Sequence, residues 1–438
     1  MKVLFNCQTI KNQKKKEIFM IKNNNSLEVL KQAFEKHAPP PDKRTNISPL
    51  EFMVQLIFCY MGDSKTFSLE SIRREMMGNL MKKINKSAFW ERLEGNRLKK
   101  SLELILEELM TAFSGHLLMG KDILKSLKVD AIWTVDSSTI RLGKKAKRNF
   151  PGTGTGSKAA IKWHACFDIL NGTMVWFKLS PGTTNDSRCF PNLAHLKNKL
   201  IIFDLGYYSY TLLLAIDNAG GFFLSRLKSN ASVTIKKVIS GVPKKAVGKS
   251  LLSINFTRGK EDPILEAIIK KEASKETIVE CRAIGFWNPS TKMYHWYLTN
   301  LVVSAHLIYP LYRLRWQIEL IFKACKNSLN VNQITSTNRH IIRNLLHASI
   351  IAYLATHTLL SNSIMYLDEQ QQQAISFQRV CKVAVTLAQD FKLFLLNSSR
   401  KYLHILLKKI KLFSDEIFDP NYRSRKTSRA CLYNLLNI

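Results

Sequence analysis

The spacing of apolar residues divides the chain into a helical first part and a mixed second part. In residues 46–125, apolar side chains recur every three or four positions, which is the pattern of short amphipathic helices. Ser68 and Asn85 precede two of these runs and suit helix N-caps. No alternating β pattern occurs before about residue 130. We therefore expect an all-α domain at 46–125, after a Lys- and Asn-rich basic segment at 1–45.

Strand patterns begin at "DAIWTVDSSTIRL", residues 130–142. Two further runs separated by the turn "DILNG" predict a hairpin. The loop after it, residues 181–199, is expected to contain a helix. The apolar run "LIIFD" at 200–204 is typical of a buried central strand, and a helix and the strand "GFFLSRLK" follow it. The predicted order is three antiparallel strands, then helix, strand, helix and strand.

The last third of the chain returns to helix after a second strand-rich segment. Alternating runs at about 230–303 predict a β-rich insertion. After it, "YRLRWQIELIFKACK" at 312–326 has a helical period, and the region 346–438 is largely helical. These patterns together predict an α+β multidomain protein with all-α regions at both ends of the chain.

Composition changes the picture through charge. The chain has 66 Lys and Arg against 33 Asp and Glu, a net charge of +33. Such a charge favours a polyanionic partner, first of all nucleic acid, although some basic proteins bind membranes or acidic proteins instead. The all-α domain at 46–125 has the size of a helix-turn-helix-like DNA-binding module, or it is a helical scaffold without DNA contact.

Cysteines and apolar runs bear on the compartment. The eight cysteines form no C-x-x-C pair, which argues against a zinc ribbon or a disulfide framework and fits a reduced, cytosolic protein. The apolar run at 344–360 contains two His, an Asn and a Ser, so we expect a buried helix rather than a membrane span. "PGTGTGSKAA" lacks the spacing of a phosphate-binding P-loop, and no ATP binding is expected.

Two acidic residues stand where strands are expected to end. Asp136 is placed at the end of the first strand and Asp204 at the end of the buried strand. Open strand ends of one sheet gather side chains into sites. Taken singly, each acid is more often a turn or cap residue. Asp168 is expected in the hairpin turn, and Asp186 is expected to cap a helix.

A third acid lies on the helix at 312–326. Glu319 is the only acid between Glu280 and Asp368. On one helix it would share a face with three polar residues beside an apolar stripe. These are Tyr312, Arg315 and Lys326. Glu319 is then either a catalytic carboxylate or half of an ordinary i,i+4 ion pair with Arg315.

The pattern Y-x2-R-x3-E-x6-K, matched from Tyr312 to Lys326, resembles the signature of the insertion-sequence-four family of bacterial DDE transposases, with Tn-five-type relatives. "VDSSTI" around Asp136 and "FDLGYYS" around Asp204 resemble the first two acid blocks of that family. "SLESI", "NKSAFWERL" and "YLTNL" extend the resemblance, which covers roughly residues 47–345.

The resemblance implies an RNase H-like catalytic domain at 126–345, interrupted by the β insertion. Asp136, Asp204 and Glu319 would be its metal-binding catalytic triad, with two Mg²⁺ ions for which Mn²⁺ could substitute. Side chains near the cut would contact DNA: Tyr312, Arg315, Lys326, Trp316 and Arg226. Trp316 would stack on an extruded base or, equally, be a packed aromatic.

The implied function is a cut-and-paste DNA transposase of an insertion sequence. It would cleave double-stranded DNA at the terminal inverted repeats and transfer the strands into target DNA. We expect a homodimer assembled partly through residues 346–438, in the bacterial cytoplasm at the nucleoid. Alternatives are a related nuclease or integrase with the same triad, or a domesticated copy that only binds DNA.

Overall fold

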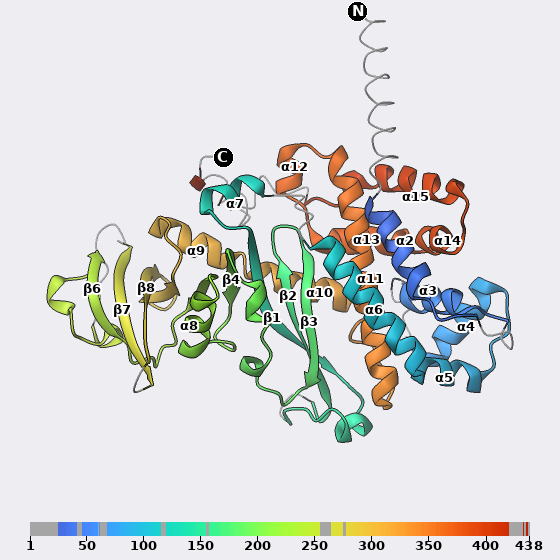
Figure 1. Ribbon diagram of the computed structural model, residues 1–438, viewed down its shortest axis with the longest axis horizontal. Coiled ribbons are helices and arrows are strands. Elements are labelled where there is room, and N and C mark those ends of the chain that lie inside the picture. Colours follow the sequence, from blue (N-terminus) through green and yellow to red (C-terminus); the bar gives the residue numbers. More distant parts are fainter. Residues whose placement is uncertain are drawn as a thin grey trace, which may run out of the picture.

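The computed structural model in Figure 1 shows helices at one end and a long sheet at the other. It describes residues 25–41, 46–59, 61, 68–114, 120–154, 157–254, 264–274, 277–419, 432, 435 and 436. Most of the predicted basic segment at 1–45 lies outside these residues, as does most of the chain after residue 419.

Within the described residues, the sheet has nine strands in the order β3-β2-β1-β4-β5-β9-β8-β7-β6. β1 is antiparallel to β2 and parallel to β4, β2 is antiparallel to β3, and β4 is parallel to β5. Their bounds are β1 Ala131–Arg141, β2 Ala160–Asp168, β3 Thr173–Pro181, β4 Lys199–Phe203 and β5 Phe222–Arg226. The predicted order of these five strands is confirmed.

The strand-rich segment is not a separate sheet. Its last strand β9 pairs antiparallel with β5, so the insertion lengthens the same sheet at one edge (Figure 1). The strands are β6 Thr234–Ser240, β7 Leu265–Ser274, β8 Thr277–Asn288 and β9 Met293–Thr299. The turn predicted around residues 289–292 joins β8 to β9.

Helices from both ends of the chain pack around α11. This helix contacts α2, α3, α5 and α6 from the N-terminal part and α13 and α15 from the C-terminal part. The helices are α2 Asn25–His37, α3 Pro49–Cys59, α4 Leu69–Leu80, α5 Lys86–Glu94, α6 Asn96–Phe113, α7 Lys121–Leu127, α8 Tyr210–Asn218, α9 Ala305–Arg313, α10 Trp316–Ser328, α11 Arg339–Ser363, α12 Glu369–Gln373, α13 Phe377–Thr386, α14 Ala388–Leu396 and α15 Arg400–Leu412.

The burial of α11 tests the prediction that the apolar run at 344–360 is a buried helix and not a membrane span. Almost every residue of this helix is buried, including both histidines of the run at 344–360. Among the described helices, none is long and apolar enough to cross a bilayer. The expected buried helix is therefore confirmed.

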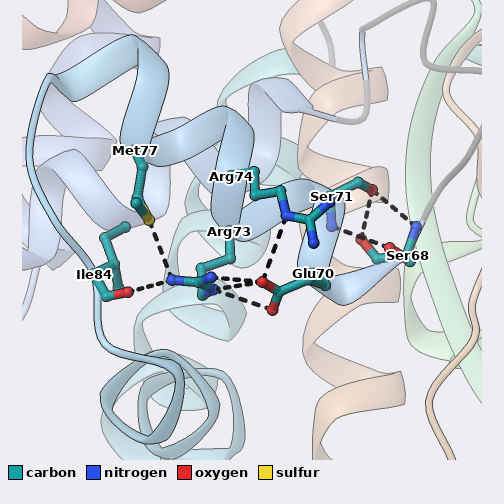
Figure 2. A network of polar contacts seen from close by, with 7 residues as sticks. All are labelled: Ser68, Glu70, Ser71, Arg73, Arg74, Met77 and Ile84. Atoms are coloured by element: carbon teal, nitrogen blue, oxygen red, sulfur yellow. Dashed lines mark hydrogen bonds and ion pairs between the residues drawn. The ribbon is translucent and has the colours of Figure 1, made fainter.

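One of the two N-caps predicted for the N-terminal helices makes a side-chain capping bond. Ser68 and Ser71 exchange hydrogen bonds at the start of α4, with each backbone N–H donating to the other's hydroxyl at 3.0 and 2.9 Å (Figure 2). Arg73 then ties α4 to the segment before α5, because it pairs with Glu70 and donates to the Ile84 carbonyl. Asn85 precedes α5 as predicted but makes no side-chain capping bond.

One predicted helix is absent. The loop at 181–199 contains two short 3-10 turns, Asp186–Arg188 and Leu193–His195. Pro191 lies between them, and proline both lacks an N–H donor and disfavours helix in the residue before it. The loop therefore bends twice on its way to β4.

Each face of the sheet has its own core. Even-numbered residues of β1 such as Ile132 and Ile140 pack with α10 and α11, whereas Val135 packs with α8 and the insertion. Ile202 of β4 joins the first core and Phe203 the second. Successive strand side chains point to opposite faces, so this alternation also fixes where the polar residues of β1 and β4 point.

Candidate active site

The register of β1 and β4 brings two acids together. Pairing ends at Val135 opposite Phe203, so Asp136 and Asp204 are the next residues on neighbouring parallel strands. Val135 and Phe203 pack in the core on the opposite face, so by the alternation of the sheet Asp136 and Asp204 point to the face that α10 covers. The placement of Asp204 directly after its strand is confirmed.

The position of Asp136 within its strand was predicted wrongly. Asp136 is the sixth residue of β1, and the strand continues to Arg141. It continues because β2 pairs with β1 as far as Arg141, whereas β4 stops at Phe203. Asp136 thus lies inside a strand but at the point where one of its two neighbours ends.

The predicted helix at 312–326 is two helices. α9 ends at Arg313 and α10 begins at Trp316, with 3-10-type bonds from Gln317 N to Leu314 O (2.9 Å) and from Ile318 N to Arg315 O (3.1 Å). Tyr312 therefore belongs to α9, while Arg315 and Glu319 stand at the start of α10. The single shared helix face was wrong, although the residues remain close in space.

Arg315 joins two of the three acids. Its Nη2 donates to Glu319 Oε1 at 2.6 Å and its Nη1 to Asp136 Oδ2 at 3.2 Å. The Arg315 side chain is only 13% exposed. The i,i+4 ion pair weighed as one interpretation of Glu319 is therefore present. This ion pair forms part of a bridge between α10 and β1, so its presence does not argue against a site at these acids.

The surroundings of Asp136 shift the pKa of its carboxyl. Burial raises the pKa of its carboxyl from 3.8 to about 6, against the lowering effects of the Ser137 N–H and of Arg315. The negative charges of Asp204 and Glu319 raise it further. The negative charges of both other acids therefore reach Asp136.

Arg226 and Tyr312 flank the acids. Arg226 ends β5, beside the end of β4, and its positive charge acts on both Tyr297 and Tyr312. Tyr312 is buried, with its ring centre 4.9 Å from that of Tyr297 and 5.9 Å from the Arg315 guanidinium carbon. Burial raises the pKa of Tyr312 to about 12, so it keeps its phenolic proton at neutral pH.

Lys326 and Trp316 lie at the two ends of α10. Lys326 Nζ donates to the Thr139 carbonyl of β1 at 2.9 Å, which holds the far end of α10 on the strand. Trp316 is 56% exposed, unlike an aromatic packed in the core. The structure thus gathers the carboxylates, Arg226, Tyr312 and Arg315 in one area and sets Lys326 and Trp316 at its borders.

A polar network behind the carboxylates was missed from the sequence. Asp186 does not cap its 3-10 turn, since Asn185 does. Its Oδ1 instead accepts from Lys162 Nζ (2.9 Å) and Ser137 Oγ (3.1 Å). A Cβ on Gly206 would lie 3.2 Å from its Oδ2, so the backbone after Asp204 approaches it closely.

Buried His164 completes this network. Its ring nitrogens contact Tyr207 Oη at 3.0 Å and Ser180 Oγ at 2.8 Å. The network tethers β1, β2, β3 and the turn after β4 just behind Asp136 and Asp204. The only signal of this network in the sequence was Tyr207, which lies in the segment around Asp204 that resembles the second acid block of the family. Asp168, by contrast, accepts from the Asn171 amide within the hairpin turn, as expected for a structural residue.

The network predicts acid sensitivity. Burial lowers the pKa of His164 to about 4, against the raising effect of Asp186 and with Lys162 and Lys178 lowering it further. Below its ordinary value of 6.5, the unfolded chain takes up a proton that the folded chain refuses. We expect the free energy of unfolding to decrease as pH falls from 6.5 to about 4.

Urea unfolding of wild type and His164→Gln across that range checks this. The variant is expected to be less stable at neutral pH and to lose less stability on acidification, since glutamine does not titrate. An equal loss in both proteins would show that His164 does not cause the effect.

Comparison with known proteins decides the family. The sequence profile of the transposase DDE domain matches residues 129–355, just over half of the chain, and includes all three acids. The chain belongs to the DDE transposases. Two insertion-sequence transposases are similar to this DDE transposase along most of their length. That of IS1151 from Clostridium perfringens is 22% identical, covering 86% of this chain and 92% of its own. That of IS231D from Bacillus thuringiensis subsp. finitimus is 23% identical, covering 69% and 71%.

A solved piggyBac transposase synaptic complex with hairpin DNA matches the transposase with a TM-score of 0.38 and 10% identity, covering 88% of this chain and 82% of its own. So low a score does not establish a common fold. The family and its relatives make this chain an insertion-sequence transposase, an enzyme that acts on DNA.

Membership of this family implies dependence on divalent metal ions. Hard oxygen ligands such as Asp136, Asp204 and Glu319 suit such ions. As the described side chains stand, however, no three from His, Cys, Asp and Glu come close enough to hold a metal ion. Arg315 instead donates to Asp136 and Glu319. The three carboxylates thus have suitable ligand chemistry for a divalent ion, but two of them are paired with a guanidinium group.

Proposed function

We propose that Asp136, Asp204 and Glu319 are the catalytic carboxylates of an RNase H-like core. The order and directions of β3, β2, β1, β4 and β5 support this core. The observation that carries the proposal is the bridge from Arg315 to Asp136 and Glu319, over the sheet edge where Asp204 follows β4. Residues 126–345 would be the catalytic domain, with 46–125 binding DNA.

The metal would be Mg²⁺, as two ions, with Mn²⁺ able to replace it. When bound, such ions activate the attacking oxygen and stabilise the leaving oxygen of a phosphodiester. The three carboxylates would hold them. Until then Arg315 keeps Asp136 and Glu319 partly neutralised, since unpaired carboxylates in a half-buried site repel one another.

The basic and aromatic residues around the acids would hold DNA. Arg315 and Arg226 have guanidinium groups suited to phosphate, and neither has its Nε hydrogen-bonded within the described chain. Tyr312 would orient Arg315 through their ring contact, and Lys326 would bind phosphate at the far end of α10. Exposed Trp316 would stack on a base extruded at the element end.

The reaction would be cut-and-paste transposition. Water attacks a phosphodiester at each element end, which breaks the strand and frees a 3′-OH. That hydroxyl attacks target DNA, so one phosphodiester forms as another breaks and no ATP is required. The Y-x2-R-x3-E-x6-K spacing from Tyr312 to Lys326 supports placing the enzyme in the insertion-sequence-four family. Two ends must be paired, so we propose a homodimer assembled partly through residues 346–438 and acting at the nucleoid.

The test is a strand-transfer assay with DNA carrying the terminal repeats, a target plasmid and Mg²⁺. We expect excision at both ends followed by products in which the 3′ ends are joined to the plasmid. Cuts without joined products would indicate a nuclease, and binding without cuts would indicate a protein that has lost catalysis. Either outcome would contradict cut-and-paste transposition.

A further inference from the structure

A polar pocket lies further along β1 and α10, beside the proposed site. It has a volume of about 660 Å³. Its lining includes Thr139, Arg141, Thr153, Ser157, Lys326 and Asn332. The residues come from β1, from the connection between β1 and β2, and from α10 with the loop after it. Two of the elements that line the pocket, β1 and α10, also carry Asp136 and Glu319.

The pocket has positive charge that the protein does not balance. No Asp or Glu is among the described residues that line it. Arg141 has no ion-pair partner within the described chain, and Lys326 Nζ donates to the neutral Thr139 carbonyl. Burial lowers the pKa of Lys326, and the charge of Arg141 lowers it further, which shows that the two cations are close. Two close cations without a carboxylate favour a bound anion.

The surrounding sequence adds to this charge. Between Asp136 and Asp168 the chain has no acidic residue and seven basic ones. These are Arg141, Lys144, Lys145, Lys147, Arg148, Lys158 and Lys162. All but Lys162 belong to the end of β1 or to the connection that follows it, and these six are exposed. A long polyanion could therefore extend from the pocket along this connection.

Hydrogen-bond donors complete the pocket. Thr139, Thr153 and Asn332 are exposed, and their side chains make no hydrogen bond within the described chain. Ser157 differs, because its hydroxyl donates to the Ala159 carbonyl at 2.6 Å. Hydroxyl and amide donors beside two cations are the groups that bind phosphate oxygens in DNA complexes.

Distance along the two elements places the pocket relative to the chemistry. Thr139 is three residues from Asp136 on a strand, about 10 Å. Lys326 is seven residues from Glu319 on a helix, also about 10 Å. One strand of duplex DNA advances about 3.4 Å along the helix axis per phosphate, and consecutive phosphates are further apart than this because the strand winds around the axis. This separation therefore corresponds to at most about three nucleotides.

We propose that this pocket binds a DNA backbone phosphate within about three nucleotides of the bond that is broken, with Arg141 as its principal new ligand. Thr139, Thr153 and Asn332 would donate to the phosphate oxygens, and Lys326 would share its charge. The inference rests on the proposed site, because it uses Asp136 and Glu319 as the point of cleavage. The phosphate belongs either to the element end or to the target DNA.

The experiment compares Arg141→Gln with Lys245→Gln, which removes the same charge from an exposed turn of the insertion. Binding is measured by gel shift on two duplexes, one carrying an element end and one of target sequence. We expect Arg141→Gln to weaken binding about tenfold on one of them and to lower its salt slope by about one unit, as for the loss of one phosphate contact. Lys245→Gln should change neither by more than about twofold.

A second arm locates the phosphate. Single neutral methylphosphonates are placed at successive positions of the affected duplex. We expect wild-type binding to weaken at one position within about three nucleotides of the cut. The same methylphosphonate should not weaken binding of Arg141→Gln any further. The inference would be overturned if Arg141→Gln bound both duplexes as tightly as the wild type. It would also be overturned if the losses in binding from Arg141→Gln and from the methylphosphonate were additive at every position. Neither readout needs cleavage, so the inference can fail while the carboxylate assignment stands.

Discussion

Replacing Glu319 by glutamine is expected to lower cleavage at the element ends by about a thousandfold. Glutamine keeps the size of the side chain and an oxygen that can accept from Arg315, but it loses the negative charge needed to hold a divalent ion. The bond between Arg315 and Glu319 is 2.6 Å long. Because an acceptor remains there, the variant should fold normally. Cleavage is measured on DNA carrying a terminal repeat, with Mg²⁺.

The matched control is Glu272→Gln, which makes the same change at an exposed position on β7 of the insertion. It should cut as fast as the wild type. Isothermal titration with Mn²⁺ gives a readout that does not depend on turnover, and we expect weaker binding for Glu319→Gln alone. Cleavage by Glu319→Gln at the wild-type rate would show that Glu319 is not a catalytic carboxylate.

The strands that build this site were predictable because their sequence signals are local. The apolar run before Asp204 is short and ends in an acid, so both the strand and its exposed end could be inferred. Asp136 lacked such a signal. Its strand continues beyond it only because β2 is longer than β4, and the lengths of neighbouring strands are set by pairing.

The break between α9 and α10 was not predictable for a related reason. The residues at the break are Leu314 and Arg315, neither of which is a helix-breaking glycine or proline. The apolar period also continues through both positions. Asp186 was missed because its partners Ser137 and Lys162 are 49 and 24 residues away in the sequence. Only the fold brings β1, β2 and this loop together.

The packing of N-terminal helices on α11 was equally beyond the sequence. Periodicity shows that α6 and α11 each have residues to bury, but not that they bury them against each other. One hydrophobic core contains residues from both, together with residues of the sheet face that Asp136 shares. Helices from both ends of the chain therefore pack together against the face of the sheet that carries the site.

Replacing Arg315 by glutamine is expected to destabilise the DNA-free enzyme by about 2 kcal/mol, because it leaves two half-buried carboxylates without their cation. Arg315 lowers the pKa of Asp136, so its loss should raise that pKa above about 6. A carboxyl whose pKa is raised on folding stabilises the folded state at low pH, and this stability is lost as pH rises through the folded value. The destabilisation should therefore be larger near pH 8 than near pH 6.

Mg²⁺ should partly restore the stability of Arg315→Gln and stabilise it more than the wild type, since the ion replaces the missing positive charge without competing against a guanidinium. Thermal unfolding at the two pH values, with and without Mg²⁺, checks both expectations. Arg313→Gln is the matched control, because Arg313 is exposed two residues away and makes no ion pair within the described chain. If Arg315→Gln lost equal stability at both pH values and gained nothing from Mg²⁺, Arg315 would be only a structural link between α10 and β1. A pH-dependent loss that Mg²⁺ reverses would instead mean that the guanidinium and the metal use the same carboxylates in turn.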